Sequence, residues 1–140
     1  MRRDERGLAV SVEAAVVLPA LVLFIALLLS LARYALAEQD VGSAAAAGAR
    51  AASLERSTAG ARDAANAAVG QNLSEHNVTC LETSLRVDAA AVSRPLGERG
   101  NVTVLVVCWV SLADISIPLI PGSVSVTAER SSPVDPLRGR

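Results

Sequence analysis

Few side chains in this sequence could carry out catalysis or hold a metal ion. There is one histidine, His76, and there are two cysteines, Cys80 and Cys108. His76 follows Glu75, as in part of an acid–base pair, but no motif fixes a nucleophile beside it, and we expect a solvated surface histidine. One histidine and two cysteines do not complete the tetrahedral ligand set of a zinc site. The residues therefore predict no enzyme, no cofactor and no metal.

The two cysteines instead favour a structural disulfide. Both lie in segments with the pattern of β-strands, which we expect on the oxidising side of a membrane. A bond between Cys80 and Cys108 would contribute roughly 3–4 kcal/mol through loop closure, and two free buried thiols are the alternative. We do not expect the cysteines to face each other across paired strands, because that register would place Gly97 and Gly100 inside the second strand.

Composition and charge exclude several binding functions. The net charge is −1, all 13 basic residues are arginine, and aromatic residues make up only 2%. The chain therefore lacks the basic surface and the aromatic stacking platform that nucleic-acid binding needs. It also lacks a glycine-rich phosphate loop, and we expect no small-molecule substrate. Hydrophobic residues make up 51%, which excludes a chain disordered throughout.

The elements that must position these residues begin with an apolar segment. Residues 14–32 carry no charge, and as a helix they span roughly 28 Å, close to the thickness of a bilayer's hydrocarbon core. This predicts a single transmembrane helix in contact with membrane lipid. Three arginines in residues 1–13 predict a cytoplasmic N-terminus and an extracytoplasmic C-terminal domain in the cell membrane.

A cleaved secretory signal is the alternative interpretation of the same segment. Ala35, Leu36 and Ala37 form an A-x-A-like cleavage site before Glu38. Cleavage there would release an extracytoplasmic binding module. Against this, the apolar stretch is longer than the usual ~7–15 residues of a signal peptide, and Arg33 stands between the stretch and the site.

Beyond the apolar segment, residues 33–70 are rich in alanine and contain no proline, which predicts that the same helix continues. We expect Gly70 and the two residues after it to end this helix. The stretch has few large apolar side chains, so we expect it to pack on its own downstream domain or on a row of identical neighbours. Small residues four apart, such as Gly42 and Ala46, would permit close helix contact.

The remaining segments have the pattern of β-strands. Residues 78–92 alternate between apolar and polar, residues 101–113 are apolar on both faces and predict a central strand, and residues 123–129 alternate again. The fold class predicted is α+β, with a small antiparallel sheet of about three strands after the long helix. The predicted domains are a cytoplasmic segment 1–13, a transmembrane helix 14–32, a helical stalk 33–70, a β-rich domain 71–130 and a flexible, unpaired tail 131–140.

An ordered set of residues in the first third of the chain resembles a known family. An Arg-Gly pair, a glutamate, a proline six residues later and a Gly-Ala-Arg element stand at Arg6-Gly7, Glu13, Pro19 and Gly48-Ala49-Arg50. Over roughly residues 6–53 the chain resembles the TadE-like proteins of tight-adherence (Tad/Flp) pilus systems. The resemblance implies a membrane-anchored, pseudopilin-like, non-catalytic component of a pilus assembly or secretion apparatus. It implies partners among other subunits of that apparatus, including like subunits through the N-terminal helix.

The resemblance also assigns expected roles to individual residues. Prepilin-type cleavage would fall between Gly7 and Leu8, which makes Glu13 the sixth residue of the product, whereas the family usually has glutamate fifth. Glu13 would pair with the terminal amine of a neighbouring subunit, or it is an interfacial carboxylate that the helix dipole favours. Pro19 would kink the helix by freeing the carbonyl of Ala15, or it is tolerated there without a function.

Overall fold

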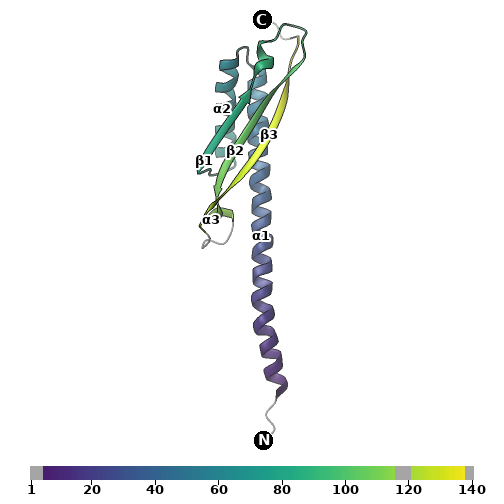
Figure 1. Cartoon of the computed structure of the whole chain (residues 1–140), viewed down its shortest axis with the longest axis vertical. Helices are drawn as coiled ribbons and strands as arrows, with labels where there is room; N and C mark the ends of the chain where they lie inside the picture. Colours follow the sequence, from purple (N-terminus) through teal and green to yellow (C-terminus); the bar gives the residue numbers. More distant parts are fainter. Residues whose placement is uncertain (1–4, 116–120, 138–140) are drawn as a thin grey trace.

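One helix, α1 (Glu5–Leu54), extends from the N-terminus to the far end of the molecule, and all other elements pack beside its second half (Figure 1). The structure is a computed structural model that describes residues 5–115 and 121–137, with side chains for residues 14–114 and 121–137. The elements after α1 are α2 (Thr58–Glu75), β1 (Glu82–Asp88), a 3₁₀ turn η1 (Ala90–Ser93), β2 (Gly100–Ser111), α3 (Leu112–Ile115) and β3 (Ser123–Val134). The predicted α+β class is confirmed.

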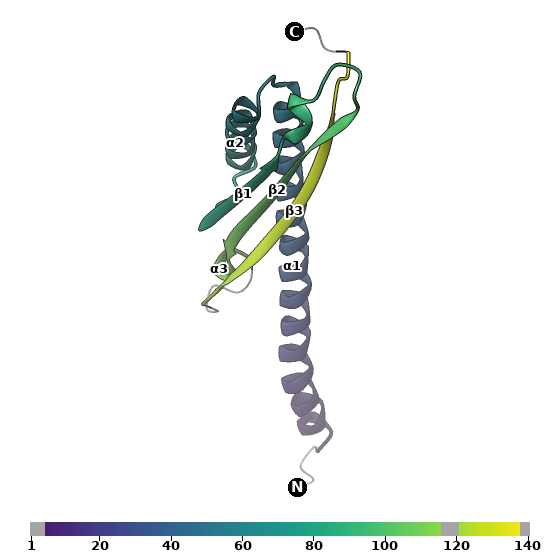
Figure 2. The ribbon, with the colours of Figure 1, turned by 45° about the horizontal axis from the view of Figure 1, so that its top comes forward.

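The predicted stalk is two helices and not one. α1 ends at Leu54, and α2 begins at Thr58 and runs back along α1 (Figure 2). Ser57 is the N-cap of α2, and its hydroxyl accepts a hydrogen bond from the backbone N–H of Gly60 at 3.0 Å. The prediction of one continuous helix was wrong because helix propensity is high throughout this stretch and does not locate the break. Reversal of the chain after Leu54 lets the alanine-rich face of α2 be buried against α1, and such packing provides most of a helix's stability.

α2 also continues past Gly70, where we expected the helix to end. It ends at Glu75, with Asn77 in the left-handed conformation at φ 55°. The N–H of Val78 donates to the carbonyl of Leu73 at 2.9 Å, and the N–H of Asn77 donates to the carbonyl of Ser74 at 3.1 Å. This is a Schellman motif, in which an asparagine takes the place that glycine usually occupies.

The sheet is antiparallel with the order β1-β2-β3, so the predicted central strand is confirmed. Alternate residues of β2 point toward the helices and are buried, namely Val102, Val104, Val106, Cys108 and Val110. β1 is shorter than the predicted strand 78–92. The Asp88 carboxylate accepts a hydrogen bond from the N–H of Ala90 at 3.2 Å, which turns the chain out of the strand and into η1.

The predicted unpaired tail begins too early, because β3 runs to Val134. Ser131 to Val134 pair with Thr103 to Gly100 of β2, and the hydroxyl of Ser132 lies 3.1 Å from that of Ser53 on α1. Pro133 fits here because β3 is an edge strand, the part of a sheet in which proline is tolerated. The prediction for residues 138–140 lies outside the described residues.

The core lies between the inner face of the sheet and the two helices, and it is built from small side chains. α1 contributes Val41, Ala44, Ala45, Ala49 and Ala52, while α2 contributes Ala61, Ala65, Val69 and Leu73. Side chains this small bring the backbones close together and fill the space between the layers without aromatic rings. The second half of α1 therefore packs on its own downstream domain, one of the two arrangements that the sequence left open.

Candidate functional site

The first half of α1 presents a large apolar surface. The segment with the highest hydropathy has a mean value of 2.8, and none of it is buried against the rest of the chain. Val16 is 69% exposed and Leu23 is 65% exposed. An apolar surface of this extent needs a cover of lipid or protein. α1 is thus long and apolar enough to cross a membrane, as residues 14–32 predicted.

The N-terminal residues on which the resemblance to TadE-like proteins rests all lie on this helix. α1 includes Gly7, Leu8, Glu13 and Pro19, and it continues through the proline. The side chains of residues 5–13 are outside the described part of the structure. Cleavage after Gly7 and charge pairing by Glu13 therefore stay predictions, as does the kink at Pro19.

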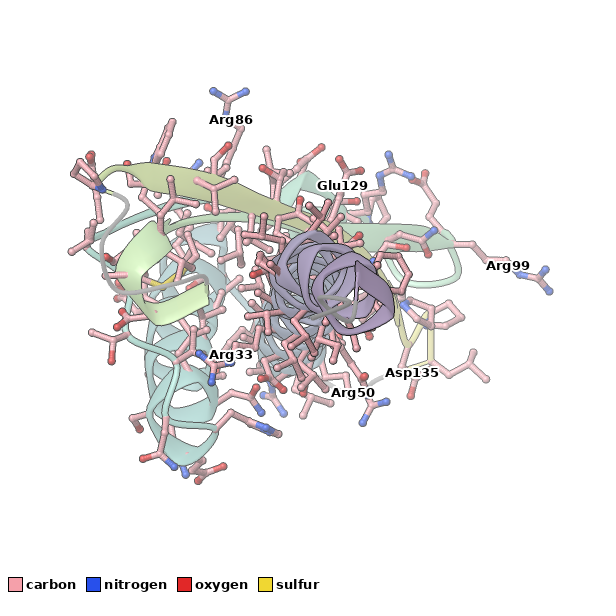
Figure 3. All side chains as sticks on the ribbon, turned by 90° about the horizontal axis from the view of Figure 1, so that it is seen from below. Arg33, Arg50, Arg86, Arg99, Glu129 and Asp135 are labelled. Carbon is pink, nitrogen blue, oxygen red and sulfur yellow. A yellow bond between two sulfur atoms is a disulfide. The ribbon has the colours of Figure 1, made fainter. Side chains whose placement is uncertain are left out.

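The Gly-Ala-Arg element has a packing role that follows from its position. A Cβ on Gly48 would lie 2.7 Å from Val69 Cγ2, so only glycine lets α2 approach α1 this closely. Ala49 is 1% exposed and belongs to the core. Arg50 is exposed and points away from α2 and α3 (Figure 3). Gly48 and Ala49 thus pack between the helices and the sheet, and Arg50 does not.

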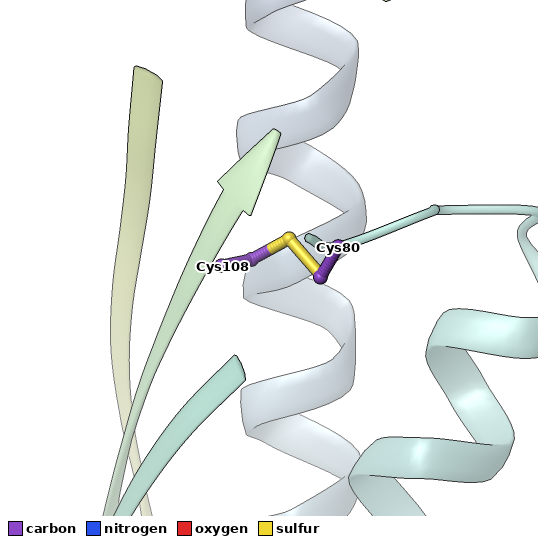
Figure 4. The surroundings of a disulfide bond; sticks show 2 residues. All are labelled: Cys80 and Cys108. Carbon is purple, nitrogen blue, oxygen red and sulfur yellow. A yellow bond between two sulfur atoms is a disulfide. The ribbon is translucent and has the colours of Figure 1, made fainter. Parts of the chain in front are cut away.

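The predicted disulfide is present and joins Cys80 to Cys108, with their Cα atoms 5.4 Å apart. Cys108 is buried on the inner face of β2, and the bond runs from it to Cys80 on the segment before β1 (Figure 4). Cys108 of β2 is paired with Thr83 of β1, so Cys80 lies before the paired region and not opposite Cys108, as expected. The bond therefore fixes the segment between α2 and β1 against the buried face of β2.

A pocket of about 370 Å³ opens at the end of the folded unit nearest the exposed half of α1. α1 lines it from Arg33 to Asp40, and the segment that follows α2 lines it from His76 to Thr79. Val110 of β2 and Asp114 of α3 complete the wall. The Schellman motif at the end of α2 positions His76 and its neighbours here, and the short α3 brings Asp114 toward α1.

Charged groups of both signs meet in this pocket. His76 Nδ1 lies 3.3 Å from Asp40 Oδ1, and the exposed fractions of the two side chains are 44% and 29%. Arg33 Nη1 donates a hydrogen bond to the carbonyl oxygen of Asp114 at 3.3 Å. The expectation for His76 was incomplete, because its partner is Asp40 of α1. Glu75 instead accepts a hydrogen bond from Gln71 at 2.8 Å.

Sequence reasoning missed this grouping because its members come from three separated segments. Each residue alone has the pattern of a solvated charge, and only the α1–α2 reversal and the β2–β3 connection bring them together. Within the described residues, no three histidine, cysteine, aspartate or glutamate side chains are arranged as metal ligands. The pocket can hold a charged group by ion pairing and hydrogen bonding.

Comparisons with known proteins bear on the N-terminal segment. The family model described as "TadE-like protein" matches residues 9–50. Neither a curated protein nor a solved structure matches the chain. The match spans the apolar half of α1, the stretch that lines the pocket and the Gly48-Ala49-Arg50 element. TadE-like proteins are components associated with the Tad pilus, and over residues 9–50 this chain is similar to that family, as its residues predicted.

Proposed function

We propose that this protein is a membrane-anchored, pseudopilin-like structural component of a Tad/Flp-type pilus assembly or secretion apparatus, without catalytic activity. The observation that carries the proposal is the division of α1 into two unlike halves. The first half is apolar and unburied, while the second half forms the core of the α+β unit. One helix thus serves as anchor and scaffold at once, so whatever holds the anchor also orients the folded unit.

The proposed orientation places the N-terminus in the cytoplasm and the folded unit outside. Arginines precede the apolar run at Arg2, Arg3 and Arg6, in agreement with the excess of positive charge on the cytoplasmic side. The Cys80–Cys108 bond supports the same direction, because disulfides persist in oxidising compartments.

The proposed partners are membrane lipid, other subunits of the apparatus and like subunits that meet through the N-terminal helix. In this arrangement Glu13 neutralises the terminal amine of a neighbouring subunit. A charge pair at the edge of the hydrocarbon is strong because the local dielectric is low, and loss of one partner leaves the other charge uncompensated.

Glu13→Gln tests the assembly role, because it keeps the side-chain size and removes the charge. We expect normal abundance of the variant in the membrane, together with loss of pilus assembly or of partner co-purification. Glu38→Gln is the matched control, since Glu38 is an exposed glutamate on the same helix beyond the apolar run. Assembly at the wild-type level with Glu13→Gln would reject charge pairing.

The mass of the intact protein from isolated membranes distinguishes the proposal from the secreted alternative. Loss of residues 1–7 supports prepilin-type processing, and a full-length chain supports simple anchoring. Loss of residues 1–37 supports a released binding module. The measurement is needed because the buried core residues of α1 begin at Val41, so cleavage after Ala37 would keep every buried residue of the folded unit.

A further inference from the structure

We infer that the pocket between α1, the end of α2 and α3 binds the headgroup of a phospholipid that carries both a phosphate and a primary ammonium group. The inference rests on the proposed membrane anchoring of α1 and adds a specific ligand to it. Its basis is the position of the pocket relative to the apolar run, the charges in its wall and the residues that complete it.

The depth of the pocket matches the headgroup layer. The uncharged run ends at Ala32, and Arg33 is the first charged residue after it. At about 1.5 Å per residue, Asp40 lies roughly 10 Å farther along the helix than Arg33. The headgroup layer adds about 5–7 Å on each side of the hydrocarbon core. The wall between Arg33 and Asp40 thus starts at the hydrocarbon boundary and extends through the headgroup layer.

The charges of both signs in the wall fit such a headgroup. Arg33, at the hydrocarbon boundary, reaches from α1 toward α2 and α3 (Figure 3). One of its N–H groups reaches the Asp114 carbonyl, and the guanidinium has further donors for phosphate oxygens. The carboxylates of Asp114, beside Arg33, and of Asp40, farther along α1, can receive the ammonium. Asp40 already has the His76 ring 3.3 Å away, which leaves Asp114 as the more available partner.

The composition of the wall predicts selectivity among headgroups. A headgroup with phosphate but no cation would bring its negative charge near the carboxylates of Asp40 and Asp114 and offer neither of them a cation. A quaternary ammonium cannot donate hydrogen bonds to these carboxylates, and it prefers aromatic cages. The described wall supplies the aliphatic side chains of Leu36, Val78 and Val110 and no phenylalanine, tyrosine or tryptophan ring, and its imidazole, that of His76, lies beside Asp40. A primary ammonium, with three N–H donors, fits best.

The test uses the full-length, disulfide-bonded chain in nanodiscs that contain equal parts of phosphatidylethanolamine, phosphatidylglycerol and phosphatidylcholine. Native mass spectrometry then counts the lipids that stay bound after release. We expect at least about a fivefold preference for phosphatidylethanolamine, equivalent to roughly 1 kcal/mol. Arg33→Gln and Asp114→Asn should each abolish the preference.

Two control variants match these changes in chemistry. Arg50→Gln removes an exposed arginine of the same helix that points away from the pocket, and Asp63→Asn neutralises an exposed aspartate of α2. Both should keep the preference. Soluble glycerophosphoethanolamine should displace the lipid, whereas equal inorganic phosphate should not. Displacement by phosphate alone would overturn the lipid site in favour of a free-phosphate site.

Flotation with vesicles after alkaline extraction separates this inference from the proposed anchoring. Loss of the chain from the vesicles would contradict the anchoring and, with it, the headgroup site. A chain that floats but binds the three lipids equally would overturn the headgroup site alone. An equal loss of the preference for phosphatidylethanolamine in Arg33→Gln and Arg50→Gln would overturn the headgroup site as well, because the effect would then be independent of the pocket.

Discussion

Gly48 is the residue at which α1, α2 and the sheet come closest together. Besides its 2.7 Å approach to Val69 Cγ2, a methyl group here would lie 3.4 Å from the Ala65 carbonyl oxygen and 3.5 Å from Val104 Cγ1. The neighbours come from both other layers, so neither can move without disturbing the core. The glycine of the family-type Gly-Ala-Arg element is thus explained by packing between the helices.

Gly48→Ala and Gly70→Ala should have opposite effects on the free energy of unfolding. Both place alanine in a helix, which is worth about 1 kcal/mol, but Gly70 has open space beside it. Overpacking at Gly48 costs about 1–3 kcal/mol. The free energy of unfolding of Gly48→Ala should therefore lie below that of Gly70→Ala by this amount. Urea unfolding of the full chain in micelles measures the difference. Val69→Ala should rescue Gly48→Ala, and equal effects of the two alanines would contradict the packing role.

The disulfide should contribute about 3–4 kcal/mol to the stability of the folded unit, from the loop of 28 residues that it closes. Replacing both cysteines with serine should lower the urea midpoint accordingly. Reductant should lower the midpoint of the wild type and leave that of the double variant unchanged. Unfolding of the wild type that is insensitive to reductant would show that the bond does not stabilise this unit.

At the scale of elements, the strands were predictable from the sequence and the helix reversal was not. Residues 123–129 alternate between apolar and polar, which is typical of a strand buried on one face. Residues 101–113 are apolar on both faces, which is typical of a central strand. The break at residues 55–57 contains neither glycine nor proline, and Ser57 is the one local signal for it, a serine suited to an N-cap. The pocket depends on this break, which is why Asp40 and His76 could not be paired from sequence.

Ser57→Ala tests whether the cap holds the reversal. Loss of the hydrogen bond to the Gly60 N–H should cost about 1 kcal/mol of folding free energy, while Ser57→Asp should retain most of it. Urea unfolding followed by circular dichroism measures both. A loss from Ser57→Asp as large as that from Ser57→Ala would exclude capping as the cause.

At the scale of the whole molecule, one continuous helix joins the apolar segment that we propose as the membrane anchor to a small α+β unit. The two share α1 without a flexible linker, and Arg33 further ties the end of the anchor to α3 through Asp114. Forces or contacts on the anchor therefore reach the sheet directly. This suits a structural subunit whose folded unit must be presented at a fixed height and direction above a membrane.

The most direct test of this account maps which residues water reaches from outside the membrane. Single cysteines replace Glu98, in the exposed turn between β1 and β2, and Leu21, in the apolar half of α1. The native cysteines are paired and stay in place. A membrane-impermeant maleimide applied to intact spheroplasts should label the Glu98→Cys protein fully and leave the Leu21→Cys protein unlabelled until detergent is added. Labelling of Glu98→Cys only after lysis, or of Leu21→Cys without detergent, would contradict the account.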